Sequence, residues 1–111
     1  MNIANPDLFS ELVILTGTIL RAEQSPKARR PAYRLWIDFG NFGIKSSSAQ
    51  ITENYDTEGL IGTQVLAVVN FPPKLIAGFK SECLVLGAVD SEGKVILIRP
   101  DQRVQNGLRI A

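Results

Sequence analysis

The sequence predicts a small all-β protein: a five-stranded barrel with a short helix between the third and fourth strands. Two observations predict this fold. Short runs of β-branched and aliphatic residues are separated by turns rich in Gly, Pro and Asn. The segment that breaks this alternation, residues 51–62, lies between the third and fourth runs. The 111 residues suffice for a single domain, residues 1–111, with one hydrophobic core.

The N-terminal residues predict a short helix followed by a long strand. Pro6 suits the first turn of a helix, with Asp7 or Asn5 as its N-cap. Such a short helix must pack on another element, because it is not stable alone. Residues 12–22 are mostly β-branched or aliphatic, and Gly17 predicts a bend or bulge in this strand.

A polar loop, residues 24–31, leads into a predicted hairpin. Residues 33–39 alternate between apolar and polar types, and residues 42–50 run back after a turn at Gly40-Asn41. Trp36 falls on the polar side of the first of these strands. We expect it in a subunit interface, with stacking on a base as the alternative.

The next segment predicts a short helix, with Thr52 as a candidate N-cap. Strands follow at residues 63–70 and 83–89. Between them, Pro72-Pro73 stiffens a connection that no helix or central strand could use, since two backbone donors are missing.

The C-terminal residues predict an added hairpin. A turn at residues 90–93 precedes a strand at residues 94–99, and Asn106-Gly107 forms a turn before the apolar Leu108 and Ile110. With the N-terminal helix, these are short additions to the barrel. The complete order of elements is the layout of the OB-fold, a small, partly open barrel whose loops bind nucleic acids.

Composition narrows the classes of function. The chain has no histidine, which removes the commonest general base and the triads built on it, so we expect no catalysis. No metal site or cofactor is expected, and no P-loop occurs. The single cysteine, Cys83, lies in an apolar run and is expected to be a buried, inert core residue. Without an internal disulfide, signal peptide or membrane span, we expect a cytoplasmic protein with no membrane insertion.

Charge is localised although the net charge is only +1. Six basic and two acidic residues lie between Arg21 and Lys45, whereas residues 46–62 hold three acids and no base. A basic face is therefore plausible on a nearly neutral protein.

Residues 70–81, from Asn70-Phe71-Pro72-Pro73-Lys74 to Gly78-Phe79-Lys80-Ser81, resemble the signature of the OB-fold tRNA-binding domain. That domain also occurs at the C-terminus of bacterial methionyl-tRNA synthetase. Residues 47–52 and 100–107 further resemble the CsaA group of free-standing members. The chain departs from the family at Val13-Ile14-Leu15, where an Asp-hydrophobic-Arg triplet is usual. Because these three residues are apolar, we expect them to be buried and not to contact a ligand.

The resemblance implies a small homodimer that binds tRNA by structure and not by sequence. The long cations of the 70–81 loop suit a phosphate backbone, with solvated lysines as the alternative, and Asn70 and Ser81 could equally hold the loop's own backbone. Lys45 and Ser47 should share one strand face, with Ser48 and Gln50 on the other. The predicted RNA-binding residues are Asn70, Lys74, Ser81, Lys80, Lys45, Ser48, Gln50, Lys27, Arg29 and Arg30.

An alternative function is a chaperone-like role in the export pathway. The same loop carries apolar side chains that could bind unfolded or export-bound polypeptides in a groove. The residues predicted for this role are Phe71, Leu75, Ile76 and Phe79.

Overall fold

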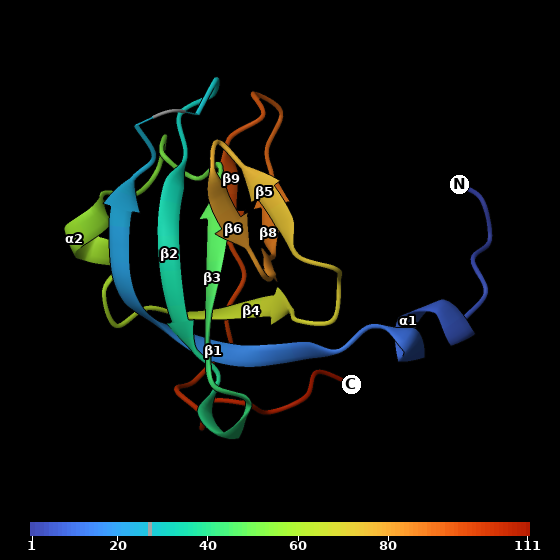
Figure 1. Ribbon diagram of the computed structural model, residues 1–111. Coiled ribbons are helices and arrows are strands. Elements are labelled where there is room, and N and C mark those ends of the chain that lie inside the picture. The colour runs from blue at the N-terminus through green and yellow to red at the C-terminus, as the bar shows by residue number, and fades with distance from the viewer. Residues whose placement is uncertain (27) are drawn as a thin grey trace.

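A computed structural model describes residues 1–26 and 28–111 and has the predicted OB-fold barrel (Figure 1). Lys27 lies outside the described residues. The barrel strands are β1 (Ile14–Gln24), β2 (Tyr33–Asp38), β3 (Ile44–Ala49), β4 (Gln64–Val68) and β7 (Leu84–Val85). They form one antiparallel sheet in the order β3-β2-β1-β4-β7. The sheet nearly closes, because β3 also contacts β7 at its far edge.

Strand β1 belongs to both halves of the barrel. Residues 14–18 pair with β4 and residues 18–24 with β2. Gly17 was predicted to mark a bend or a bulge, and the bulge is not there: the register shifts between Ile19 and Arg21, with Leu20 as the extra residue. Gly17 serves packing instead: a Cβ there would lie 2.6 Å from Ile37 Cγ2 and 2.7 Å from Phe39 Cε1.

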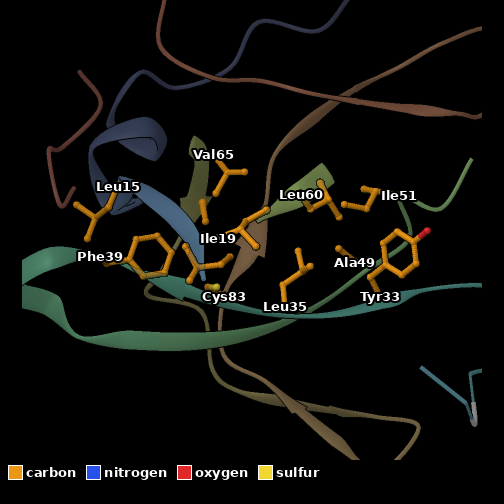
Figure 2. Packing of buried hydrophobic residues seen from close by; sticks show 12 residues of the cluster. Leu15, Ile19, Tyr33, Leu35, Phe39, Ala49, Ile51, Leu60, Val65 and Cys83 are labelled. Atoms are coloured by element: carbon orange, nitrogen blue, oxygen red, sulfur yellow. The ribbon is translucent and has the colours of Figure 1, made fainter. Parts of the chain in front are cut away.

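The hydrophobic core fills the barrel (Figure 2). Alternate residues of β2, from Tyr33 through Leu35 to Ile37, point inward, as the sequence pattern predicted. Phe39, toward one end of this core, and Leu60, in its interior, are fully buried (Figure 2). In the apolar segment Val13-Ile14-Leu15, Ile14 and Leu15 are buried and Val13 is partly buried, as expected.

Both helices are short. Helix α2 (Thr57–Leu60) lies between β3 and β4 and is capped by Asp56, whose Oδ1 accepts a 2.6 Å hydrogen bond from Gly59 N. The predicted cap Thr52 is therefore wrong, and the helix starts later. A 3-10 turn, η1 (Gly40–Phe42), connects β2 to β3.

Helix α1 (Asp7–Glu11) extends away from the barrel and buries none of its residues (Figure 1). The prediction that it packs on another element is wrong for this single chain. Asn5 Oδ1 accepts a hydrogen bond from Asp7 N at its start. Leu8 and Phe9 remain about half exposed, 55% and 48%.

The predicted turn at residues 90–93 and the strand after it are confirmed, because residues 87–89 and 95–97 pair as an antiparallel hairpin. Residues 106–110 do not form a hairpin with residues 94–99. The predicted 83–89 strand divides into β7 and β8 (Gly87–Val89), because the chain changes partner there: β8 pairs with β9 (Val95–Leu97). The tail instead lies along β1, where Gly107 N donates to Thr16 O (2.7 Å) and Ile110 N to Ile14 O (2.9 Å).

Candidate functional site

The predicted 70–81 loop contains a hairpin. Strands β5 (Lys74–Ile76) and β6 (Phe79–Ser81) pair with Lys74 opposite Ser81. Ala77 and Gly78 form the turn, with φ of 51° and 76°. Positive φ at both turn residues is required by a type I′ hairpin turn. The sequence predicts a loop here and not a hairpin, because Pro72-Pro73 disfavours a strand and the apolar run after it is short.

The hairpin has an inner and an outer face. Cross-strand partners share a face, so Lys74, Ser81, Ile76 and Phe79 lie on one side and Leu75 and Lys80 on the other. Ser48 N donates to Ser81 Oγ (3.0 Å), which identifies the first side as the one facing the barrel. Leu75, on the outer side, is 75% exposed.

Three consecutive serines of β3 attach this region to the barrel. Ser46 Oγ lies 2.6 Å from Lys80 O and 2.8 Å from Glu82 Oε1, so its single proton serves one acceptor at a time. Ser47 Oγ donates to Cys83 O (2.8 Å). We call this serine-bridged boundary, between residues 46–48 and 80–83, the seam. Sequence analysis assigned Ser48 to RNA binding, and nothing in the local pattern indicated that Ser46 and Ser47 bond to distant acceptors.

Glu82 is a functional-site neighbour that sequence reasoning missed. Its Oε1 accepts a hydrogen bond from Ser46 N (3.0 Å). This backbone bond lowers the pKa of Glu82 below its ordinary 4.5, against desolvation, which raises it; the Ser46 hydroxyl and the positive charges of Lys80 and Lys45 lower it further. The ionised carboxylate therefore favours the closed seam.

Two grooves flank the hairpin and share Ser48 and Ile76 in their linings. The first, of about 260 Å³, runs along the β5 side and is lined by Phe71, Lys74 and Ser81 among others. The second, of about 440 Å³, separates the hairpin tip from the β1–β2 loop. Its lining residues are Ala28, Arg29, Arg30, Ala32, Ser48, Gln50, Ile76 and Ala77. Figure 1 shows that the β1–β2 loop and the hairpin tip lie at the same end of the barrel.

A cluster of cationic and aromatic side chains lies beside the hairpin. The Trp36 and Phe79 rings meet edge to face, with centroids 5.4 Å apart. The Arg21 guanidinium lies 4.5 Å from the Trp36 ring centroid, and that of Arg34 lies 4.9 Å from the Phe79 centroid. Trp36 was expected in a subunit interface. Its contacts with Phe79 and Arg21 within the chain already explain why it is partly buried.

The structure thus brings together six of the predicted RNA-binding residues and separates others. The six are Lys74, Ser81, Ser48, Gln50, Arg29 and Arg30. Asn70 instead ties the N-terminal segment to the end of β4: its Oδ1 accepts from Val13 N and its Nδ2 donates to Glu11 O, each at 2.8 Å. Lys80 lies on the outer hairpin face, and Lys45 lines neither groove.

Cys83 is buried in the core, as predicted (Figure 2). Burial raises the pKa of its thiol to about 12, so the reactive thiolate is scarce at neutral pH. In residues 1–26 and 28–111, we find no acidic or cysteine cluster that could hold a metal ion. Among the helices that the structure describes, none is long and apolar enough to cross a membrane.

Comparison with protein families gives one match over most of the chain. Residues 14–109 match the model of the family described as "Putative tRNA binding domain". Methionine–tRNA ligase from Porphyromonas gingivalis is 35% identical over 102 residues, and that from Flavobacterium johnsoniae is 31% identical over 102 residues. Each alignment covers 92% of this chain but only 15% and 14% of the respective ligase.

Solved structures match the whole fold. Chaperone CsaA from Bacillus anthracis has a TM-score of 0.94 and 53% identity, covering 99% of this chain and 100% of that one. CsaA chaperone protein from Picrophilus torridus has a TM-score of 0.91 and 46% identity, covering 98% and 100%. The MetRS-related protein from Pyrococcus horikoshii has a TM-score of 0.89 and 28% identity, with both chains fully covered.

Proposed function

This chain belongs to the tRNA-binding domain family, and we propose that it binds tRNA through the shape and backbone of the folded RNA, without catalysis. The observation that carries the proposal is the gathering of Lys74, Arg29 and Arg30 around one hairpin. Proteins recognise folded RNA largely by phosphate and 2′-hydroxyl contacts. Cations suit the phosphates, and neighbouring hydroxyl and amide side chains suit the ribose.

In this proposal the two grooves have separate roles. Arg29 and Arg30 attract the backbone at the loop end, while Lys74 contacts it across the hairpin. Ser48 and Gln50 supply polar contacts between them. Lys80 and Lys45 add positive charge from outside the grooves, and Asn70 and Ser81 keep the supporting backbone in place. Lys27 extends the charge of the β1–β2 loop in the sequence.

The test is a titration of tRNA at several salt concentrations, with native protein and Lys74→Ala. We expect steep salt dependence for the native protein, and for the variant a weaker affinity with a slope smaller by about one. Arg99→Ala is the charge-matched control, because Arg99 lines a different hollow, with residues 61–64 and 100–103. An affinity that is insensitive to salt, or equal loss in both variants, would refute the site.

We also propose that two copies associate through α1 and the C-terminal tail. Phe9, Leu12 and Ile110 line an open apolar hollow of about 400 Å³, and Leu8 of α1 is also exposed. A second copy would cover this area and give α1 the packing that it lacks. Sedimentation should give a dimer for the native protein and a monomer for Phe9→Asp. A native monomer contradicts this proposal.

A cytoplasmic location fits the lone cysteine, which offers no internal disulfide. Cell fractionation tests this location directly. Recovery of the protein from an extracellular or membrane fraction would contradict it.

A second candidate function is binding of unfolded polypeptides. It is favoured by Phe71 and Leu75, which are 44% and 75% exposed, with Ile76 and Phe79 on the inner face. Two similar proteins carry the name chaperone. An extended apolar peptide should bind with little salt dependence and lose affinity in Leu75→Ser, whereas tRNA should respond to Lys74→Ala. Competition between peptide and tRNA would place both ligands at the hairpin.

A further inference from the structure

Arg34 is attached to the tip of the β5–β6 hairpin from the barrel wall. It lies on β2, directly opposite Ser48 of β3. Its Nη2 donates a hydrogen bond to Ala77 O (3.3 Å), and its guanidinium lies over the Phe79 ring. One side chain thus contacts both the turn and the strand that follows it. The sequence separation of 43 residues concealed this contact from pattern analysis.

The hairpin needs such a contact at its tip. Its own pairing consists of three residue pairs, and a two-stranded hairpin is marginally stable in water. The serine bonds of the seam hold only its base, through Ser81 and Lys80. At the tip, Ala77 adopts a positive φ that favours glycine. The Arg34 bond to the Ala77 carbonyl stabilises this turn.

The guanidinium is turned into the protein and not toward the grooves. Arg34 is half-buried, and its Nε is buried with no acceptor among the described residues. A buried donor without an acceptor destabilises the fold, and this cost opposes the stabilising contacts that Arg34 makes with Ala77 O and the Phe79 ring. Arg34 lines neither groove, whereas Ala77 and Ile76 of the hairpin do.

We propose that Arg34 is a positioning residue: it fixes the hairpin tip against β2 and so sets the spacing between Lys74 and the Arg29-Arg30 pair. This inference rests on the proposed tRNA binding. RNA phosphates have fixed spacings, so cations on a loosely held hairpin bind them less tightly even when every charge is kept.

The test compares Arg34→Lys with Arg21→Lys. Both variants keep the positive charge but replace a planar guanidinium by a compact ammonium, which cannot cover a ring face and reach the same carbonyl acceptor in the same geometry. Of the two arginines, only Arg34 bonds to the hairpin. Two readouts of hairpin position are independent of RNA. One is amide hydrogen exchange of residues 74–81, and the other is the fluorescence of Trp36, the only tryptophan of the chain, which contacts Phe79.

For Arg34→Lys we expect roughly tenfold faster exchange in the hairpin, a shifted Trp36 emission, and roughly tenfold weaker tRNA binding with an unchanged salt slope. Arg21→Lys should leave hairpin exchange and tRNA affinity near native values. Arg34→Met, which keeps the stem but has no donor, should loosen the hairpin in the same way and provides a second variant if the lysine side chain disturbs folding.

Three outcomes would overturn the proposal. Unchanged hairpin exchange in both Arg34 variants would show that Arg34 does not hold the tip. Faster exchange with native tRNA affinity would show that tip position is irrelevant to binding. A salt slope smaller by about one in Arg34→Met, which removes the charge, would assign Arg34 a direct phosphate contact. If the native protein binds no tRNA, the proposed function fails, and hairpin exchange still decides whether Arg34 holds the tip.

Discussion

The two sides of the barrel are closed in different ways. On the wall formed by β2, β1 and β4, continuous backbone pairing joins the strands, interrupted by a single bulge at Leu20. At the seam, side chains make most of the connections: Ser46, Ser47 and Ser81 bridge β3 to residues 80–83, and one backbone bond, from Glu82 N to Ser46 O (2.8 Å), supports them.

This difference indicates which surface of the protein is available to bind a ligand. The backbone groups of the wall are paired between its strands, and its inner side chains are buried in the core. The seam leaves grooves on both sides of the hairpin and exposes polar groups within them. Stability therefore resides in the wall, and the candidate binding surface lies where strand pairing is incomplete.

The strongest test of this comparison removes Phe39, which is fully buried at the end of β2. Phe39→Ala should lower the free energy of unfolding by about 3–5 kcal/mol, because it deletes a large core side chain and leaves a cavity. Urea denaturation measures this change. Phe42→Ala is the matched control, since Phe42 is exposed. Equal losses in the two variants would mean that the wall does not dominate stability.

A smaller effect is expected at the seam. Ser47→Ala removes the donor to Cys83 O and should lower the free energy of unfolding by about 1–3 kcal/mol, because a buried acceptor loses its partner. Ser91→Ala, in an exposed turn, should change it little. A loss as large as that of Phe39→Ala would remove the distinction between wall and seam.

The hairpin turn should respond in the opposite direction. Ala77→Gly relieves the positive φ of 51° and should raise stability by about 0.5–1 kcal/mol, net of the entropy that glycine adds to the unfolded chain. Ala88→Gly, in strand β8, should lower it by a similar amount. Thermal unfolding distinguishes the two signs, and a destabilised Ala77→Gly would contradict the assigned turn.

The smallest effect concerns pH. Because the folded-state pKa of Glu82 is lowered, its contribution to stability is present above the unfolded-state pKa and is lost as pH falls through the folded-state pKa. Glu82→Gln should therefore flatten the stability profile below about pH 4.5. Exposed Glu53→Gln is the control. Urea midpoints between neutral and acidic pH measure both profiles, and identical acid limbs in native protein and Glu82→Gln would contradict the prediction.

Local pattern by itself determined the fold class and much of the core. Alternation along residues 33–39 fixed which side chains of β2 face inward, since side chains alternate across a strand. The turn before β3 followed from Gly40-Asn41, and the apolar run around Cys83 indicated its burial. The motif at residues 70–81 located the candidate site, and six of the predicted RNA-binding residues line its grooves.

Only the tertiary structure decided which side chains hold that site together. Asn70 bonds to residues 57 and 59 positions away, Ser47 to one 36 away, and Arg34 to one 43 away. The sequence shows that a side chain can donate a hydrogen bond, but it does not show which group accepts it. A distant acceptor is brought close only when the other elements pack. The same reason explains why the tail along β1 emerged only when the chain was folded. The cap at Asp56 and the 74–81 hairpin join residues close in the sequence, so they were missed as local signals.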